Sequence, residues 1–246
     1  MPFEIEGIVL GNRYAGNNTA WISIYAPQIA RTALPGQFVM VEAVGKFLRR
    51  PISIASVSGG RIFLLIRIVG DGTRIIASVR RNEKLKILGP LGNGFPENVQ
   101  NPILVGGGIG IAPLIFASQK MKENGKSFVA IYGERTADDI IWGDFLPENV
   151  QICTDDGSAG FRGTTVDLLK KQNPAPIFAC GPQPMLKAIS EIAYKWNVPA
   201  YISLEERMAC GFGVCQGCVV KTKNGYRRVC TDGPVFAATE IYENTR

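Results

Sequence analysis

The sequence predicts a mixed fold, an all-β part followed by an α/β part, with a small cysteine-rich module at the carboxyl end. Up to about residue 88, short β runs alternate with glycine, proline and asparagine turns, which is typical of an antiparallel barrel or sandwich. From about residue 100, strands alternate with helices, which indicates a parallel sheet. We therefore expect an N-terminal antiparallel β-barrel over residues 1–98, a central α/β domain over 99–203 and a C-terminal module over 204–246.

The first part contains five β runs, each bounded by turn residues: Phe3–Leu10, Thr19–Tyr25, Gln37–Glu42, Arg61–Val69 and Leu85–Leu88. Between them, Arg49–Ala55 reads RRPISIA. Because proline cannot donate a ladder hydrogen bond, this segment is expected at an edge or an opening of the sheet. Further on, Arg67 lies in a β run and Gly70–Thr73 follows as a turn with a hydroxyl. Such a turn suits a pyrophosphate, but it is equally typical of a simple hairpin.

The second part begins with a strand, a glycine loop and a helix. Ile103–Val105 has the composition of a buried strand, Gly106–Gly110 follows it, and a helical pattern runs from Pro113 to about Asn124. This arrangement brings a pyrophosphate onto a helix N-terminus, where backbone donors and the helix dipole favour negative charge. The loop reads GGGIG and lacks the GxGxxG fingerprint, so by itself it is also consistent with an ordinary turn.

The alternation then continues, with strands at Ser127–Tyr132, Val150–Thr154, Pro176–Ala179 and Val198–Leu204, and a helix at Gln183–Trp196. Repeated βα units predict an open parallel sheet with a ligand crevice at the carboxyl ends of its strands. Cys180 follows one of these strands and is expected at that crevice. Cys153 lies inside another strand and is expected to be a buried core thiol. We place the domain boundaries near Pro96–Pro102 and Ser203–Met208.

The third part contains four cysteines in the order CxxxxCxxC…C, namely Cys210, Cys215, Cys218 and Cys230. This is the plant-type spacing of thiolate ligands for a [2Fe–2S] cluster. A pair of disulfides and a structural zinc site are the alternatives. Disulfides are disfavoured without an export signal, and zinc usually takes two separated CxxC or Cys/His pairs. A Rieske centre is excluded because it needs two histidines and the chain has none.

Composition narrows the function further. The formal charge of +6 comes from 27 basic and 21 acidic residues and is not gathered into a stripe, so we expect no nucleic-acid partner. No apolar run is long enough for a membrane span, and we expect a soluble, cytoplasmic protein without a membrane partner. The absence of histidine removes Ser/His and Cys/His nucleophiles. Electron transfer therefore fits the chain better than hydrolysis.

Over its first 200 residues the chain resembles the ferredoxin reductase-like flavoproteins. Over its whole length it resembles the electron-transfer subunits of class 1B, NAD-linked dihydroorotate dehydrogenases. The motifs that carry the resemblance are RPISIA, IRIVGDGT, GPLGNGF, VGGGIGIAPL, CGPQPML and EERMACGFGVCQGCVV…VCTDGPVF. Their order within one chain is more specific than any one of them.

The resemblance implies an FAD at the barrel, with contacts from Arg50, Pro51, Ile52, Ser53, Leu65, Ile66, Arg67, Gly72 and Thr73. It implies NAD at the crevice, held by Gly106, Gly107, Gly108, Gly110, Gly181 and Pro182, with Cys180 near the nicotinamide as the candidate catalytic residue. Glu134 follows the strand at which the adenosine ribose is expected, together with Asp138 and Asp139. An acid there favours a free 2′-hydroxyl and hence NAD over NADP, although Arg135 lies beside it.

The function that the resemblance implies is an electron relay in de novo pyrimidine biosynthesis. Dihydroorotate would be oxidised at FMN in a separate catalytic subunit, in a heterotetramer of two copies of each chain. Electrons would then pass through the [2Fe–2S] cluster and FAD to NAD, because a flavin converts between one-electron and two-electron carriers. The alternatives are a subunit of an NADH-dependent ferredoxin:NADP or sulfide reductase, and a non-catalytic iron–sulfur sensor or scaffold.

Overall fold

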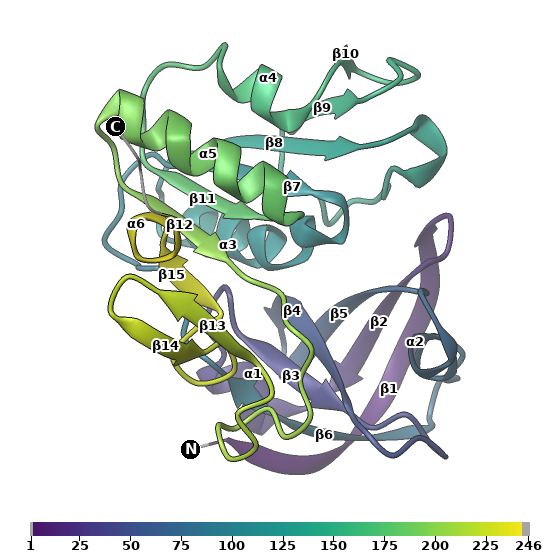
Figure 1. The fold of residues 1–246 in the computed structure, drawn as a ribbon. Helices are drawn as coiled ribbons and strands as arrows, with labels where there is room; N and C mark the ends of the chain where they lie inside the picture. The colour runs from purple at the N-terminus through teal and green to yellow at the C-terminus, as the bar shows by residue number, and fades with distance from the viewer. Residues whose placement is uncertain (1, 243–246) are drawn as a thin grey trace.

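The computed structural model describes residues 2–242 as a closed barrel, a seven-stranded sheet and a two-stranded hairpin. In Figure 1 the barrel lies below the sheet, and the C-terminal segment, drawn in yellow, runs along one side of both. This arrangement confirms the predicted fold class. Within residues 2–242, no helix combines the length and the apolar character that a membrane span needs.

The barrel is antiparallel and closes in the order β1-β2-β5-β4-β3-β6. Its strands are β1 (Phe3–Gly16), β2 (Thr19–Tyr25), β3 (Phe38–Val41), β4 (Arg50–Ser58), β5 (Arg61–Arg67) and β6 (Lys84–Leu91), with short helices α1 (Pro27–Thr32) and α2 (Asp71–Ala77). Alternate residues of neighbouring strands, such as Ile22, Ile24, Ile62 and Leu64, are fully buried inside it. The apolar side chains at every second position of these strands therefore fill the interior of the barrel.

The proline segment lies at an opening, as predicted. Pro51 is opposite Met40 on β3, whereas pairing of β4 with β5 begins only at Ile54. The other side of Pro51 is thus free of a ladder partner. The hairpin interpretation of Gly70–Thr73 is wrong, because this turn leads into α2. The Thr73 hydroxyl accepts hydrogen bonds from the backbone N–H groups of Val69 and Gly70, which stabilises the start of that helix.

The second sheet has the order β10-β9-β8-β7-β11-β12-β15. Its strands are β7 (Ile103–Gly107), β8 (Val129–Glu134), β9 (Gln151–Thr154), β10 (Phe161–Arg162), β11 (Ile177–Cys180), β12 (Ala200–Ser203) and β15 (Val235–Ala237). All neighbours are parallel except β12 and β15, which are antiparallel. The sheet of the second part is therefore completed by a strand from the third.

Helices cover both faces of this sheet: α3 (Ile111–Glu123) on the side of the barrel, and α4 (Thr165–Leu169) and α5 (Gln183–Trp196) on the other (Figure 1). The 3₁₀ turns η1 (Gly108–Gly110) and η2 (Ala137–Asp139) follow β7 and β8. Within β7, Ile103 and Val105 pack with α5 residues, while Leu104 packs with residues of α3. Burial on both faces explains why this strand is continuously apolar.

The C-terminal segment joins the two larger units. It forms the hairpin β13 (Val219–Thr222) and β14 (Gly225–Arg228), then β15, and ends at α6 (Ala238–Ile241). Phe236 and Cys230 belong to one buried cluster that also contains Met40 of the barrel and Ile202 of the sheet. The third part therefore shares its core with both others.

A second contact between barrel and sheet involves the β1–β2 hairpin and the segment after η2. The backbone N–H of Trp142 donates to the Ala15 carbonyl at 2.7 Å. The rings of Trp21 and Phe145 stack with centroids 4.0 Å apart. At the surface, Arg13 pairs with Asp144.

Candidate functional site

The nucleotide loops meet at the point where the strand order of the parallel sheet reverses. From β7 the chain proceeds through β8, β9 and β10 on one side, and then returns to place β11 and β12 on the other. The loops after β7 and β11, Gly106–Gly110 and Cys180–Pro182, therefore flank the switch point. Open α/β sheets bind ligands in the crevice at this point.

Only glycine fits at several positions of these loops. A Cβ atom at Gly110 would lie 2.3 Å from the Cys180 carbonyl oxygen, and one at Gly181 would lie 3.1 Å from Gly107 Cα. Gly108 has φ +60°, and a Cβ atom there would lie 3.4 Å from Arg67 Nη1 and 3.9 Å from Glu134 Oε2. The two loops thus approach each other closely, and the side chains of Arg67 and Glu134 lie beside the start of η1. A dinucleotide pyrophosphate fits such a cradle.

A cavity of about 280 Å³ lies between the barrel and the sheet. Six of the nine residues predicted to contact FAD line it: Pro51, Ile52, Ser53, Leu65, Ile66 and Arg67. Ile109 of the nucleotide loop lines it as well. Mostly apolar walls with a few polar groups fit the ring system of a flavin. The position next to Ile109 brings such a ring close to the NAD crevice.

The remaining three predicted FAD contacts form a second group beside the cavity. A Cβ atom at Gly72 would lie 2.3 Å from Arg50 Nε, so the guanidinium of Arg50 rests on the first turn of α2. Arg50 also donates to the Leu48 carbonyl, and Thr73 fixes the turn as described. A guanidinium beside a tight turn fits a diphosphate. The residues therefore fit FAD, with the ring at the cavity and the diphosphate at α2.

Sequence reasoning did not assign several residues that line the cavity: Phe38, Val69, Ala112, Ser203, Leu204, Glu205, Glu206, Met208 and Pro234. Five of these belong to the stretch SLEERM, directly before the cysteine loop. Its last four residues, EERM, were part of the resemblance, but the acidic residues among them had no predicted role. The signal that could have found these residues is their position in the chain, at the end of a sheet strand and directly before the first of the four cysteines, which puts them between the crevice and the cysteine loop.

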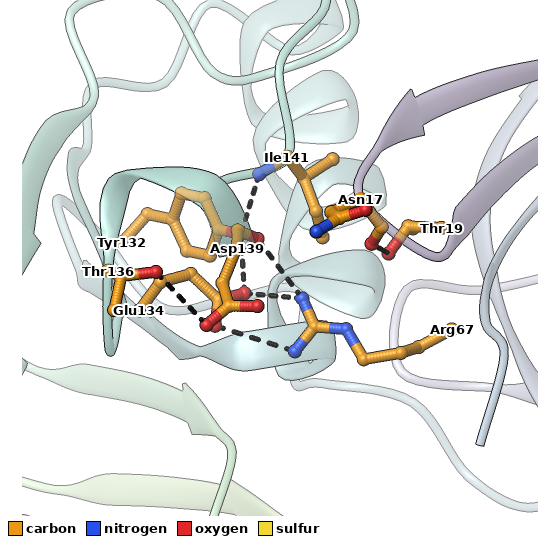
Figure 2. A network of polar contacts seen from close by, with 8 residues as sticks. All are labelled: Asn17, Thr19, Arg67, Tyr132, Glu134, Thr136, Asp139 and Ile141. Carbon is orange, nitrogen blue, oxygen red and sulfur yellow. Dashed lines mark hydrogen bonds and ion pairs between the residues drawn. The ribbon is translucent and has the colours of Figure 1, made fainter.

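Glu134 lies at the end of β8, but its carboxylate is engaged by the barrel (Figure 2). Arg67 donates from Nη2 to Glu134 Oε1 at 2.5 Å and from Nη1 to Oε2 at 3.4 Å. Burial alone would lower the pKa of Arg67, but the hydrogen bonds and charge of Glu134 outweigh burial and raise that pKa. An expected FAD contact and an expected NAD contact are therefore ion-paired with each other.

Cys180 is buried and borders the crevice with its backbone. Its carbonyl oxygen approaches Gly110, while only 2% of the residue is exposed. Burial and the negative charge of Glu205 raise the pKa of the Cys180 thiol. The thiol is therefore neutral at physiological pH. Cys153 is fully buried, as predicted, and burial raises the pKa of its thiol to about 11.

Of the other four cysteines, Cys210, Cys215 and Cys218 lie in one loop that packs against the barrel, and Cys230 follows the hairpin β13–β14. Gly211 and Gly213 have φ of +81° and +88°, and a Cβ atom at Gly211 would lie 2.5 Å from Met40 Cγ. Cys210 and Cys215 are at least partly exposed, whereas Cys218 and Cys230 are buried. None of the six cysteines forms a disulfide, which does not support the disulfide alternative.

The side chains of these cysteines approach one another in two pairs, Cys210 with Cys215 and Cys218 with Cys230. The backbone N–H of Cys215 donates to Cys210 Sγ at 3.5 Å, and that of Cys230 to Cys218 Sγ at 3.4 Å. Within residues 2–242, no three His, Cys, Asp or Glu side chains lie close enough to hold a single metal ion. Two pairs of thiols match a cluster in which two irons share four cysteines. The donor set thus fits a [2Fe–2S] cluster.

Backbone N–H groups tune the sulfurs of the loop. Burial opposes ionisation of Cys210, but N–H groups of Cys215, Phe212 and Val214 lower the pKa of its thiol to about 6. Burial and the neighbouring Cys218 raise the pKa of Cys230 to about 12. Gly217 donates a further N–H to Cys215 Sγ at 3.4 Å. Hydrogen bonds to ligand sulfurs are a known means of tuning iron–sulfur clusters.

Comparisons with known proteins agree with this geometry. A family model described as the iron–sulfur cluster binding domain of dihydroorotate dehydrogenase B matches residues 205–242. The chain is 41% identical over 260 residues to the dihydroorotate dehydrogenase B (NAD(+)), electron transfer subunit of Desulforamulus reducens, covering 98% of this chain and 99% of the relative. It is 35% identical to the subunit of the same name from Geobacillus thermodenitrificans, covering 95% and 96%.

Solved structures show the same architecture. A structure of the NADH-dependent reduced ferredoxin-NADP oxidoreductase matches with a TM-score of 0.87 and 30% identity, covering 96% of this chain and 89% of that one. The ferredoxin reductase of carbazole 1,9a-dioxygenase matches with a TM-score of 0.68 and 20% identity, covering 82% and 69%. At that identity the second likeness supports the fold alone.

Proposed function

The chain belongs to the family of electron transfer subunits of dihydroorotate dehydrogenase B (NAD(+)), and we propose that it performs that role. It relays electrons to NAD⁺ from dihydroorotate, which is oxidised at FMN in a catalytic partner subunit, by way of a [2Fe–2S] cluster and FAD. When bound, FAD exchanges single electrons with the cluster and a hydride with the nicotinamide. The assembly we expect is a heterotetramer with two copies of each subunit.

The residues of the chain have separate tasks in this relay. The walls around Pro51, Ile52 and Leu65 bind the flavin ring and exclude water from it. Arg50, above the first turn of α2, neutralises the diphosphate. The glycine loop after β7 binds the pyrophosphate of NAD, and the facing turn Cys180–Pro182 lies near the nicotinamide. Cys210, Cys215, Cys218 and Cys230 bind the cluster.

The observation that carries the proposal is the position of the cysteine loop beside the cavity. Met208 lines the cavity, and Cys210 follows it by two residues. Gly211 then packs on Met40 of β3, so the loop is held against the wall of the flavin barrel. This position supports a relay, because a one-electron site must lie close to the two-electron site with which it exchanges electrons.

The test is to purify the chain alone and together with its FMN-containing partner. The chain alone should show flavin absorption with an iron–sulfur shoulder and reduce a dye with NADH. The complex should reduce NAD⁺ with dihydroorotate. A colourless chain, or one that carries zinc in place of iron, would contradict the proposal.

A second candidate function is favoured by one observation. The solved structure at 30% identity comes from an NADH-dependent reduced ferredoxin-NADP oxidoreductase and covers nearly the whole chain. A chain with that role would pass electrons between NADH and a partner that uses ferredoxin and NADPH. Assaying the complex with dihydroorotate and, separately, with NADPH and ferredoxin distinguishes the two functions, because only one donor should reduce NAD⁺.

The cytoplasm is the location that we propose for the protein. All six of its cysteines are free thiols in the structure, and the cytoplasm keeps thiols reduced. Fractionation of cells that produce the intact complex tests this location.

A further inference from the structure

An ion pair links the barrel to the α/β domain beside the nucleotide loop. Arg67 is the last residue of β5 and Glu134 the last of β8, and they meet through the two hydrogen bonds described above (Figure 2). The Glu134 side chain is only 5% exposed, against 25% for Arg67. A Cβ atom at Gly108 would lie 3.4 Å from Arg67 Nη1 and 3.9 Å from Glu134 Oε2. The pair therefore stands directly over the loop expected to bind pyrophosphate.

The α/β domain holds the Glu134 carboxylate from a second side. Tyr132 is fully buried, and its hydroxyl donates to Glu134 Oε1 at 2.8 Å. The same hydroxyl accepts the backbone N–H of Ile141 at 3.1 Å, so its single proton is directed at the carboxylate. Glu134 Oε1 thus receives two donors, one from each domain. This fixes both the position and the direction of the carboxylate.

Arg67 also connects the ion pair with Glu134 to the wall of the flavin cavity. Arg67 lines that cavity next to Leu65 and Ile66, while its guanidinium reaches out to Glu134. It also donates from Nη2 to the carbonyl of Asp139 at 3.4 Å. Hydride transfer depends steeply on the distance between flavin and nicotinamide, and a misplacement of about 1 Å can cost roughly 100-fold in rate. The Arg67–Glu134 pair, which joins the flavin cavity to the nucleotide loop, is therefore expected to affect the rate of hydride transfer.

We propose that Glu134 is a positioning residue for hydride transfer between FAD and NAD. By holding Arg67, it fixes the position of the flavin cavity relative to the nucleotide crevice, and so the distance between flavin and nicotinamide. Its carboxylate is used for this link, so the choice between NAD and NADP is made by other residues. The proposal rests on the proposed function, because it requires FAD at the barrel and NAD at the crevice.

The test is Glu134→Gln, which keeps the size of the side chain and removes its charge. In the FAD-loaded chain, hydride transfer from NADH should slow by about 10- to 100-fold in stopped-flow measurements. The KM for NADH should change by less than about threefold, and the preference for NADH over NADPH should stay the same. If Glu134 had only a structural role, its substitution would not slow hydride transfer while leaving the KM for NADH and the cofactor preference unchanged.

A matched control is available in the second ion pair that crosses between the domains. Arg13 and Asp144 are joined at 2.6 Å, but both side chains are mostly exposed and lie outside the cavity lining. Asp144→Asn should leave hydride transfer unchanged, since exposed pairs contribute little. Tyr132→Phe provides a second variant, which removes the hydroxyl that orients Glu134 and accepts the Ile141 N–H, and it decides the question if Glu134→Gln fails to fold.

A readout besides activity is the charge-transfer absorption that arises when nicotinamide stacks on the bound flavin. It should weaken in Glu134→Gln and Tyr132→Phe but not in Asp144→Asn. If the unmodified chain binds no FAD, the proposed function fails and this proposal fails with it. If that chain is active, unaltered hydride transfer in both variants, or a shift of about tenfold in preference toward NADPH, overturns the positioning role alone.

Discussion

At the scale of single residues, the cysteines divide into two kinds by their surroundings. Cys153 and Cys180 lie in the sheet, where burial raises the pKa of each thiol and keeps it neutral. Cys210 and Cys215 lie on a loop rich in positive-φ glycines, where backbone N–H groups point at sulfur. The spacing of the cysteines predicted this division, because ligand spacing is a local property of the chain.

The substitution Cys215→Ser should remove the cluster and leave the flavin in place. One of the four thiolates is lost, whereas the cavity that binds the flavin ring contains no cysteine. Electron transfer to and from the partner should stop, while reduction of a dye by NADH survives. The visible spectrum and both assays measure this. Cys153→Ser is the control, which should keep its iron–sulfur absorption; loss of both activities in Cys215→Ser would contradict separate sites.

The substitution Gly72→Ala should weaken FAD binding. Its Cβ atom would lie 2.3 Å from Arg50 Nε, so the guanidinium must leave the first turn of α2. Loss of one charge-assisted contact of about 1.5–3 kcal/mol corresponds to a rise of roughly 10- to 150-fold in the Kd of FAD. Titration of the flavin-free protein with FAD measures it. The exposed Arg74→Gln, on the last turn of the same helix, should bind FAD normally, and an unchanged Kd in Gly72→Ala would refute the placement of the diphosphate.

At the scale of elements, strands bounded by turn residues were predicted even where they are short, as β9 and β11 show. β2 and α5 have the predicted bounds, whereas α4, β10 and the C-terminal strands were not anticipated. β10 and α4 contain two and five residues, too few positions to show a period. The turn Gly70–Thr73 was left open between a hairpin and a phosphate turn. It became a helix start because Thr73 binds the backbone of the turn.

Helix α4 offers a test at this scale through its N-cap. Thr164 accepts the N–H of Asp167, and Thr164 donates its hydroxyl and its own N–H to the Asp167 carboxylate. These bonds, the hydroxyl first, lower the pKa of Asp167 below its ordinary value of 3.8. A carboxyl with a lowered folded-state pKa stabilises the fold above its unfolded pKa, and that stabilisation is lost as the pH falls through the folded value.

The substitution Thr164→Ala should therefore cost about 1 kcal/mol of unfolding free energy at pH 7. The difference from the unmodified chain should shrink as the pH drops below 3.8, because protonated Asp167 no longer accepts these bonds. Thermal unfolding of both chains across this pH range measures the effect. Thr239→Ala, at an exposed position of α6, serves as the control. A cost that is independent of pH would show that the carboxylate bonds do not contribute.

At the scale of the whole molecule, the three parts share strands, hydrogen bonds and one buried cluster. β15 completes the seven-stranded sheet, and Asn93 of the barrel side donates to the carbonyls of Asp232 and Val235. Phe236 lies in the cluster shared by barrel, sheet and cysteine loop. The division into residues 1–98, 99–203 and 204–246 thus stays a prediction. The buried cluster contains residues from all three of these segments.

The substitution Phe236→Ala should destabilise all three parts together. Removal of this buried ring should cost about 3–5 kcal/mol, which lowers Tm by roughly 6–20 °C for a chain of this size. Flavin release and loss of secondary structure should occur in one transition. Fluorescence and circular dichroism during heating measure both. Tyr226→Ala, which truncates an exposed ring on β14, should leave Tm unchanged, and two well-separated transitions in Phe236→Ala would contradict a shared core.

The sequence alone determined the order of the parts, the spacing of the four cysteines and the glycine loop after a buried strand. These features depend on spacing, on turn residues and on alternation of apolar residues, all of which act over a few positions of the chain, whereas the residues expected at the flavin were implied by the resemblance to a known family. The tertiary structure alone decided that Arg67 and Glu134 are partners, that β15 joins the sheet and that Met208 lines the flavin cavity. Each of these contacts joins residues that lie far apart in the chain or belong to different units. They form because burial favours shared surfaces and because buried charges need partners, and no local pattern records which surfaces will meet.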